Sequence, residues 1–180
     1  IVGDVYEIGD KTFFSGRTQL QLTAFDNKAG VERIMYSVDG SEYKPYEDKA
    51  LYLSTEAGRH SIKYYAVDST GNSSADSKRP NEYDYVLENY YIDLTGPEIT
   101  YAVSGPSLKT DEKLILSPES LVKIEALDPE SGVKNKAFSF NNEIKEREYA
   151  EGIPLDELDY GDNYIGFIAY DNVNNRNIGD

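Results

Sequence analysis

The sequence predicts an all-β protein in which two antiparallel β-sandwiches follow one another along the chain. Three observations predict it: an internal repeat with an offset of 102 or 103 positions, short alternating segments separated by turn signals about every 8–12 residues, and almost no helical periodicity. The matched pairs of the repeat are Asp26 and Asp128, Gly30 and Gly132, Val31 and Val133, Gly58 and Gly161, Ile62 and Ile165, Ala66 and Ala169, Asp68 and Asp171, and Asn72 and Asn175.

The first copy begins with two predicted strands, residues 1–8 and 18–25, which are separated by a turn at 9–11. The second of these is the clearest strand in the chain, because apolar and polar residues alternate along it. Its expected core-facing residues are Leu20, Leu22 and Ala24, and its expected solvent-facing residues are Gln19, Gln21 and Thr23.

A tight hairpin is predicted next, with strands at 33–38 and 41–46 joined by Asp39 and Gly40. An Asp-Gly pair between alternating segments is among the strongest short-range signals for a hairpin. Pro45 has no backbone N–H, so the returning strand should lie at a sheet edge. The expected core residues of the first strand are Ile34, Tyr36 and Val38.

The first copy closes with strands expected at 51–54, 60–67 and 83–92, and with a polar loop at 73–81. The middle strand should bury alternate residues, namely Ile62, Tyr64 and Ala66. Aspartate side chains can accept nearby backbone N–H groups, while glycine and asparagine tolerate positive φ. The expected turn-forming residues are Asp26, Gly30, Asp39, Gly40, Asp68 and Asn72.

The second copy is expected to repeat this plan, with the domains at residues 1–94 and 95–180 and a stiff junction ending in Pro97. Three departures stand out. Lys136 replaces Ile34, which predicts a strand that is less buried or locally shifted, and Asn141-Asn142 replaces the Asp-Gly pair. No segment of the second copy matches residues 83–92, so we expect this copy to lack a full final strand or to take one from residues that follow it. Its expected core residues are Val122, Ile124, Ala126, Phe138, Phe140, Ile165, Phe167 and Ala169.

Composition narrows the range of partners. The 180 residues carry 33 acids and 18 bases, a net charge of −15, which disfavours nucleic acid and anionic lipid and attracts cations. No apolar run is long enough to span a membrane. The absence of cysteine leaves the compartment open. The chain starts at Ile1 without a leader pattern, so we expect a piece of a longer chain.

The motifs themselves resemble a known family. The patterns A-x-D-x-x-[SA]-G-V, Y-S-V-D-G and G-x-H-x-I-x-Y-x-A-x-D-x-x-G-N resemble the bacterial immunoglobulin-like repeats of cell-surface and outer-membrane proteins. Y-S-V-D-G is also similar to the immunoglobulin-like domain at the C-terminus of chitobiases. Residues 94–97, with Asp93 before them, are similar to the D-x-T-x-P opening of such repeats. The resemblance implies two tandem immunoglobulin-like antiparallel β-sandwiches that are extracellular, periplasmic or on the bacterial cell surface.

The chain carries no catalytic pattern, and we expect no enzyme activity. His60 is the only histidine, and its repeat counterpart is Asn163, which favours a hydrogen bond that braces a turn over a catalytic base. Zinc sites of the usual kind need cysteine or several histidines, and no phosphate-binding glycine loop is present.

A calcium site is one interpretation of the acidic turns in the second copy. In an immunoglobulin-like sandwich, Asp128, Glu130 and Asp171 would gather near Asp93, and carboxylates with loop carbonyls suit calcium. The alternative is that these aspartates close their own turns through hydrogen bonds to backbone N–H groups. No other cofactor is expected.

Two functions stay open on the sequence. The first is a structural or adhesive module, a tandem spacer of a bacterial cell-surface or secreted protein. The second is a carbohydrate-binding or accessory module of a secreted glycan-processing enzyme, which the chitobiase-like segment and 16 tyrosines favour and the absence of tryptophan weakens. The expected partners are other domains of the same parent chain and a surface glycan or protein.

Overall fold

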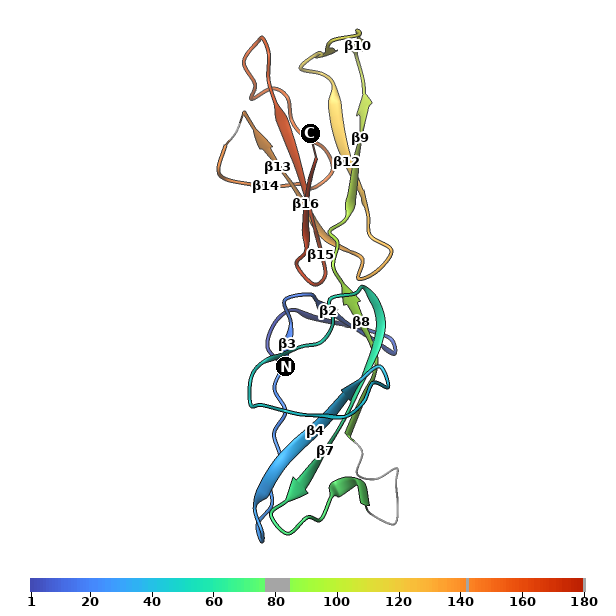
Figure 1. Ribbon diagram of the computed structural model, residues 1–180. Coiled ribbons are helices and arrows are strands. Elements are labelled where there is room, and N and C mark those ends of the chain that lie inside the picture. Colours follow the sequence, from blue (N-terminus) through green and yellow to red (C-terminus); the bar gives the residue numbers. More distant parts are fainter. Residues whose placement is uncertain (77–84, 142, 180) are drawn as a thin grey trace. The chain divides into compact units, whose positions relative to one another are not determined.

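The computed structural model describes residues 1–76, 85–141 and 143–179, and it confirms the all-β prediction (Figure 1). The single helical segment of the described residues is the 3-10 turn η1 (Ser74–Asp76). None of the described residues forms a helix long and apolar enough to cross a membrane. The chain divides into two compact units, Ile1–Leu94 and Thr95–Asp180.

The first unit has a large sheet and a small one. The large sheet has the order β1-β2-β8-β7-β4-β5, in which every neighbouring pair is antiparallel except β2 and β8, which run parallel. The small sheet pairs β3 with β6, and an isolated bridge joins Val2 to Gln19. The strands are β1 (Val5–Ile8), β2 (Lys11–Ser15), β3 (Gln19–Leu20), β4 (Val31–Val38), β5 (Lys44–Pro45), β6 (Leu51–Tyr52), β7 (Gly58–Asp68) and β8 (Tyr85–Asp93).

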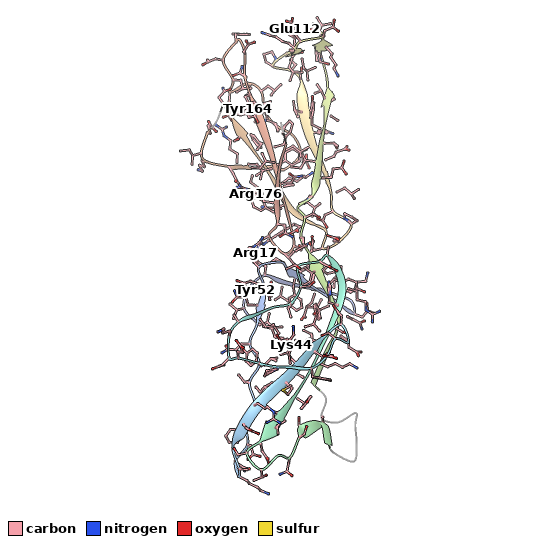
Figure 2. The ribbon with its side chains drawn as sticks, viewed as in Figure 1. Arg17, Lys44, Tyr52, Glu112, Tyr164 and Arg176 are labelled. Carbon is pink, nitrogen blue, oxygen red and sulfur yellow. The ribbon has the colours of Figure 1, made fainter. Side chains whose placement is uncertain are left out.

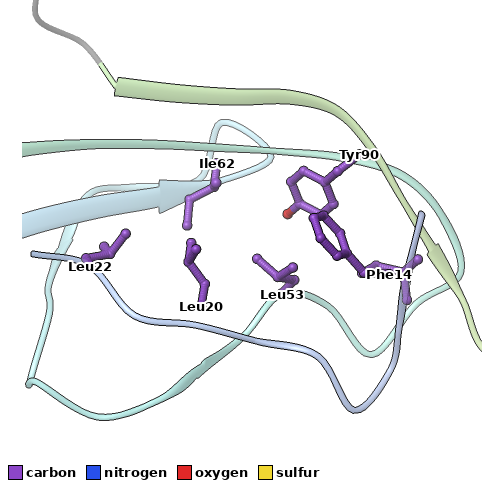
Figure 3. Close-up of a cluster of buried hydrophobic side chains, with 7 residues drawn as sticks. Phe14, Leu20, Leu22, Leu53, Ile62 and Tyr90 are labelled. Carbon is purple, nitrogen blue, oxygen red and sulfur yellow. The ribbon is translucent and has the colours of Figure 1, made fainter. Parts of the chain in front are cut away.

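The core of the first unit lies between these two sheets (Figure 3). Ile62 and Tyr90 extend from β7 and β8 toward side chains from the opposite layer. Phe14 meets Tyr90 edge to face, with ring centroids 5.7 Å apart, a favoured geometry for aromatic pairs. The buried members are Phe14, Leu20, Leu22, Leu53, Ile62, Tyr90 and Ile92.

Two features of the predicted hairpin are confirmed. Asp39 and Gly40 both have positive φ, 52° and 73°, the combination that a two-residue hairpin turn of type I′ requires. Pro45 lies in β5, the last strand of the large sheet, as its missing N–H predicts.

The predicted strand at residues 18–25 is only partly right. Leu20 and Leu22 are buried as expected, but β3 ends at Leu20, and Ala24 is exposed. The hairpin strand β2 was not predicted. Residues 77–81 of the predicted loop, residues 83 and 84 of the last predicted strand, and Asn142 of the second-copy turn lie outside the described residues.

The second unit also has two facing layers and a hairpin. One sheet has the order β14-β13-β15-β16, the other pairs β9 with β12, and β10 pairs with β11. The strands are β9 (Glu98–Ser104), β10 (Ser107–Lys109), β11 (Leu114–Leu116), β12 (Leu121–Leu127), β13 (Val133–Phe140), β14 (Arg147–Glu148), β15 (Ile165–Asp171) and β16 (Arg176–Gly179). Its buried core residues are Val122, Ile124, Phe138, Phe140, Ile153, Leu155 and Phe167.

The repeat extends to strand register. Ile34 pairs with Ala66 in the first unit, and Lys136 pairs with Ala169 at the equivalent place in the second. Both central strands carry an irregularity near their first residue, between Val31 and Arg33 and between Val133 and Asn135. Both consequences expected from Lys136 are therefore wrong: the strand keeps its register, and β13 buries more of its residues than β4, with Lys136 half-buried like Ile34.

The last strand of each unit differs in length. β8 has nine residues along β7, whereas β16 pairs with β15 over four residues, from Arg176 to Gly179. A short final strand in the second copy was expected from the sequence, and its incompleteness remains a prediction.

Candidate functional site

Two aspartate turns close one end of the first unit. Oδ1 of Asp26 accepts three backbone N–H groups, from Lys28 at 2.8 Å, Ala29 at 2.7 Å and Gly30 at 3.0 Å. The bonds from Lys28 and Gly30 favour the charged carboxylate and lower the pKa of Asp26. Gly30 has a φ of 75°, which a residue with a side chain would adopt only with strain.

The second turn is centred on Asp68 at the end of β7. Oδ2 accepts a bond from Nδ2 of Asn72 at 2.8 Å, and Oδ1 accepts the backbone N–H of Asn72 and both the N–H and hydroxyl of Thr70. The bonds from Asn72, then those from Thr70, outweigh desolvation and lower the pKa of Asp68 to about 2. The backbone N–H of Ser69 donates to the carbonyl of Gly30 at 3.1 Å, which ties the two turns together.

The second unit builds the same pair of turns. Oδ1 of Asp128 accepts the N–H groups of Glu130 and Gly132, both at 2.9 Å. Oδ1 of Asp171 accepts those of Val173 at 2.9 Å and Asn175 at 2.7 Å. The backbone N–H of Asn172 donates to the carbonyl of Gly132 at 3.1 Å, the counterpart of the bond that joins the turns in the first unit.

The two second-unit aspartates of the expected calcium site lie together. Asp128 and Asp171 each offer a carboxylate oxygen, and these two oxygens are within 4.8 Å of one another. Asp171 is fully buried and Asp128 nearly so. Two carboxylates at this spacing could share a calcium ion. The hydrogen bonds that close the two turns also orient both carboxylates without a metal ion. Turn formation alone therefore explains the same geometry.

The other two expected ligands belong to different units. Glu130 lies two residues after Asp128, and its Oε2 is 3.5 Å from the hydroxyl of Thr95. Asp93 is the last residue of β8 and belongs to the first unit, where its register partner is Ser15. The four-residue calcium site therefore remains a prediction from the sequence.

His60 forms structural contacts at the base of the hairpin that follows β4. Its Nδ1 is 2.7 Å from Oδ2 of Asp39, and its Nε2 is 2.9 Å from the carbonyl oxygen of Glu56. Burial opposes ionisation of Asp39, but the hydrogen bonds from His60 and Ser61 prevail and lower the pKa of Asp39. Both ring nitrogens thus have structural partners at the base of the hairpin.

Asn163 braces the equivalent hairpin of the second unit. Its Oδ1 accepts Nδ2 of Asn141 at 2.9 Å, and its Nδ2 donates to the carbonyl of Asp159 at 2.8 Å. Asn141 and Asp159 are the repeat counterparts of Asp39 and Glu56. An amide thus does in one unit what an imidazole does in the other, which requires no acid–base chemistry.

A hollow of about 350 Å³ opens beside the aspartate turns of the first unit. Its lining is partly apolar and partly polar, and no motif in the sequence predicts it. The lining residues are Phe25, Asp26, Val31, Ala66, Val67, Asp68, Asn72, Ser73 and Ser74.

Two long cationic side chains of the second unit have roles that sequence reasoning missed. Nζ of Lys136 donates to the carbonyl of Ile124 at 2.8 Å and lies 4.5 Å from the ring centroid of Tyr149. Arg147 pairs with Glu143 and Glu157 at 2.9 and 2.6 Å. The partners of Lys136 and Arg147 lie on loops or far away in the sequence, so no local sequence pattern predicts these contacts.

Comparison with known proteins finds a distant structural likeness. No protein-family model matches the chain, and no curated protein matches it. The solved structure of the fibronectin(III)-like modules of Clostridium thermocellum CbhA is similar at 12% sequence identity and a TM-score of 0.40, over 92% of this chain and 85% of that one. A likeness at this score carries no argument about what this chain does.

Proposed function

We propose that the chain is a non-catalytic structural module, a tandem immunoglobulin-like spacer of a bacterial cell-surface or secreted protein. The observation that carries the proposal is that polar side chains at equivalent positions of the two units form equivalent structural hydrogen bonds. Asp68 and Asp171 close equivalent turns, and His60 and Asn163 brace equivalent hairpins. Polar groups that are engaged in the same structural bonds in both copies serve the fold, which is what a spacer requires.

The exposed aromatic side chains also favour a spacer over a sugar-binding module. Tyr52 and Tyr164, labelled in Figure 2, come from different units. Tyr52 accepts a hydrogen bond from Nε2 of Gln19 at 2.7 Å, and Tyr160 is 98% exposed on a loop. Sugar binding usually needs several aromatic faces beside convergent polar groups, and these tyrosines are spread along the chain.

Single-molecule stretching of the chain tests the spacer function. A spacer of two independent modules should unfold in two separate force events. The fully extended lengths of the two unfolded units are roughly 340 and 310 Å, from about 3.6 Å for each residue, and each event should lengthen the chain by this amount less the end-to-end length of the folded unit. One event for the whole chain, or a gradual extension without a peak, would contradict independent load-bearing modules.

A retention assay separates the spacer from the alternative accessory module. The chain should not be retained by insoluble cellulose, chitin or xylan, and it should release no product from chromogenic glycosides. Retention by one polysaccharide that free oligosaccharide competes away would replace the spacer with a carbohydrate-binding module.

A further inference from the structure

The tight turn after β4 places an aspartate directly before a glycine. Asp-Gly occurs once in the 180 residues, at Asp39 and Gly40, and Asn-Gly does not occur. Gly40 has no side chain to hinder its own amide nitrogen, and a Cβ added there would meet no atom within 4 Å. Both residues are exposed, and 46% of the Asp39 side-chain surface is open to solvent. The pair therefore has the chemistry and the access for an aspartate to cyclise onto the next residue.

The reaction open to this pair is isomerisation through a succinimide. The amide nitrogen of Gly40 forms a bond to Cγ of Asp39, a C–O bond of the carboxyl group breaks, and the hydroxyl leaves with the amide proton as water. Water then adds to the backbone carbonyl carbon of the ring and opens the ring there. The chain afterwards runs through Cβ and Cγ of Asp39, as isoaspartate, with one more atom in the backbone. No reactant other than water is needed.

Two residues of β7 hold the Asp39 carboxylate. Oδ1 accepts the backbone N–H of Ser61 at 2.8 Å, and Oδ2 lies 2.7 Å from Nδ1 of His60, whose side chain is only 9% exposed. The backbone N–H of Asp39 donates to the carbonyl of Ser61 at 2.9 Å, which fixes the same part of the turn. Cyclisation requires Cγ to turn toward the nitrogen of Gly40. Because both oxygens are engaged on β7, this rotation has to break both contacts.

The same contacts keep the carboxyl group in its less reactive form. Burial opposes ionisation of Asp39, but the hydrogen bonds from His60 and Ser61 prevail and hold its pKa below the usual range. The ionised carboxylate is the poorer electrophile, because the protonated acid can lose water whereas the carboxylate has no hydroxyl to lose. Position and charge thus act in the same direction.

We propose that Asp39 is a modification site at which isoaspartate forms, and that His60 and the backbone of Ser61 limit the rate by holding its carboxylate on β7. His60 is a positioning residue in this scheme, since it acts only through Asp39. The modification has a structural consequence. The turn sets the register in which β4 pairs with β5, at Tyr36 with Lys44, and an additional backbone atom in the turn would disturb this pairing.

Ageing of the full chain with substitutions at His60 tests the proposal. The chains are kept at one mildly acidic pH, below the melting temperature of the least stable variant. Isoaspartate at position 39 is quantified by peptide mapping with fragmentation across the Cα–Cβ bond. His60→Ala should form it about tenfold faster than the parent chain, the factor that corresponds to the loss of one hydrogen bond to a charged group. His60→Asn should give an intermediate rate, because its side-chain amide can still donate to the carboxylate.

Two further variants make the result specific. Leu22→Ala destabilises the core of the same unit but leaves the Asp39 contacts in place, so its rate should remain that of the parent chain. Gly40→Ala should slow the reaction in the parent chain and in His60→Ala, because the methyl group hinders the attacking nitrogen. Three outcomes would overturn the proposal. Equal rates in His60→Ala and the parent would mean that the contact does not restrain Asp39, and a slower rate would mean that the ring promotes the reaction. An equal acceleration in Leu22→Ala would mean that unfolding of the whole unit controls the rate.

Discussion

Oδ2 of Asp39 lies 2.7 Å from Nδ1 of His60, and the other nitrogen of that ring lies 2.9 Å from the carbonyl oxygen of Glu56. One imidazole therefore connects the tight hairpin after β4 with the turn before β7. The ring is nearly buried and lies stacked on Tyr90, with centroids 5.9 Å apart. His60 is therefore a structural residue, and its removal should lower the free energy of unfolding of the first unit.

Replacing His60 by alanine should lower the free energy of unfolding by about 1–3 kcal/mol, because the contacts of the ring with the Asp39 carboxylate and the Glu56 carbonyl are lost. His60→Asn is the matched variant, since asparagine does this bracing at position 163. It should recover part of the loss in urea denaturation. Equal stability of the alanine variant and the parent chain would show that the bonds contribute nothing net.

The turn at Asp68 predicts a loss of stability in acid. Hydrogen bonds from Asn72 and Thr70 lower the pKa of Asp68 to about 2 in the folded chain, whereas an unfolded aspartate titrates near about 3.9. The folded pKa is the lower one, so the stabilisation is present above about pH 4 and is lost as the pH falls toward about 2. Thermal unfolding of Asp68→Asn should therefore depend less on pH across this window than unfolding of the parent chain.

Thr70→Val provides an intermediate test of the same turn. It keeps the carboxylate but removes the hydroxyl that donates to Oδ1 at 2.8 Å. The acid-induced loss should then be smaller than in the parent chain and be complete at a higher pH, because one bond to the charged form is missing and the folded pKa lies closer to the unfolded one. Superimposable pH profiles for all three chains would contradict the assignment.

The strand register after β3 gives a contrast between neighbouring residues. Leu22 is 3% exposed in the core, and Gln21 faces solvent. Leu22→Ala should cost about 2–5 kcal/mol, from lost burial and a cavity. Gln21→Ala should change stability by no more than about 0.5 kcal/mol. Denaturant unfolding measures both, and a reversal of the two effects would mean a register shifted by one residue.

Turn residues and the repeat were predictable because they carry strict local requirements. A two-residue hairpin turn of type I′ needs positive φ at both positions, which Asp39 and Gly40 adopt, so the motif is visible in the sequence. The extent of the strand at 18–25 was not predictable. Alternation locates the buried side chains Leu20 and Leu22, but a strand also needs a partner for its backbone, and alternation does not report whether one is present.

The candidate site was predictable only in part for a similar reason. The aspartate and glycine spacings indicate where each turn closes, and Asp128 and Asp171 meet because their turns are joined through Asn172 and Gly132. Lys136 was harder to interpret. Its ammonium group donates to the carbonyl of Ile124, and this contact depends on how β12 and β13 pack together. The presence of a lysine among core positions does not by itself predict that contact.

Calcium binding at the second-unit turns is the remaining prediction from the sequence. The carboxylates of Asp128 and Asp171 have oxygens within 4.8 Å, and two like charges at about 4 Å repel by about 1 kcal/mol even in a water-like dielectric. A calcium ion would remove this repulsion. At about 10 mM calcium, roughly ten times the weakest affinity expected of extracellular modules, binding would stabilise the unit by about 1.4 kcal/mol. The melting temperature should then rise by roughly 5–11 °C.

Variants of the two sister turns distinguish a calcium site from turn formation alone. Asp171→Asn keeps an oxygen that can accept the N–H groups of Val173 and Asn175 but removes the charge, so it should abolish the calcium-dependent rise. Asp68→Asn makes the same change in the first unit and should leave the rise intact.

Asp93→Asn and Glu130→Gln should reduce the calcium-dependent rise if these residues complete the site. Magnesium should have a much smaller effect, because it requires a tighter octahedral cage. An identical melting curve in chelator and in calcium would leave Asp128 and Asp171 as turn-forming residues only.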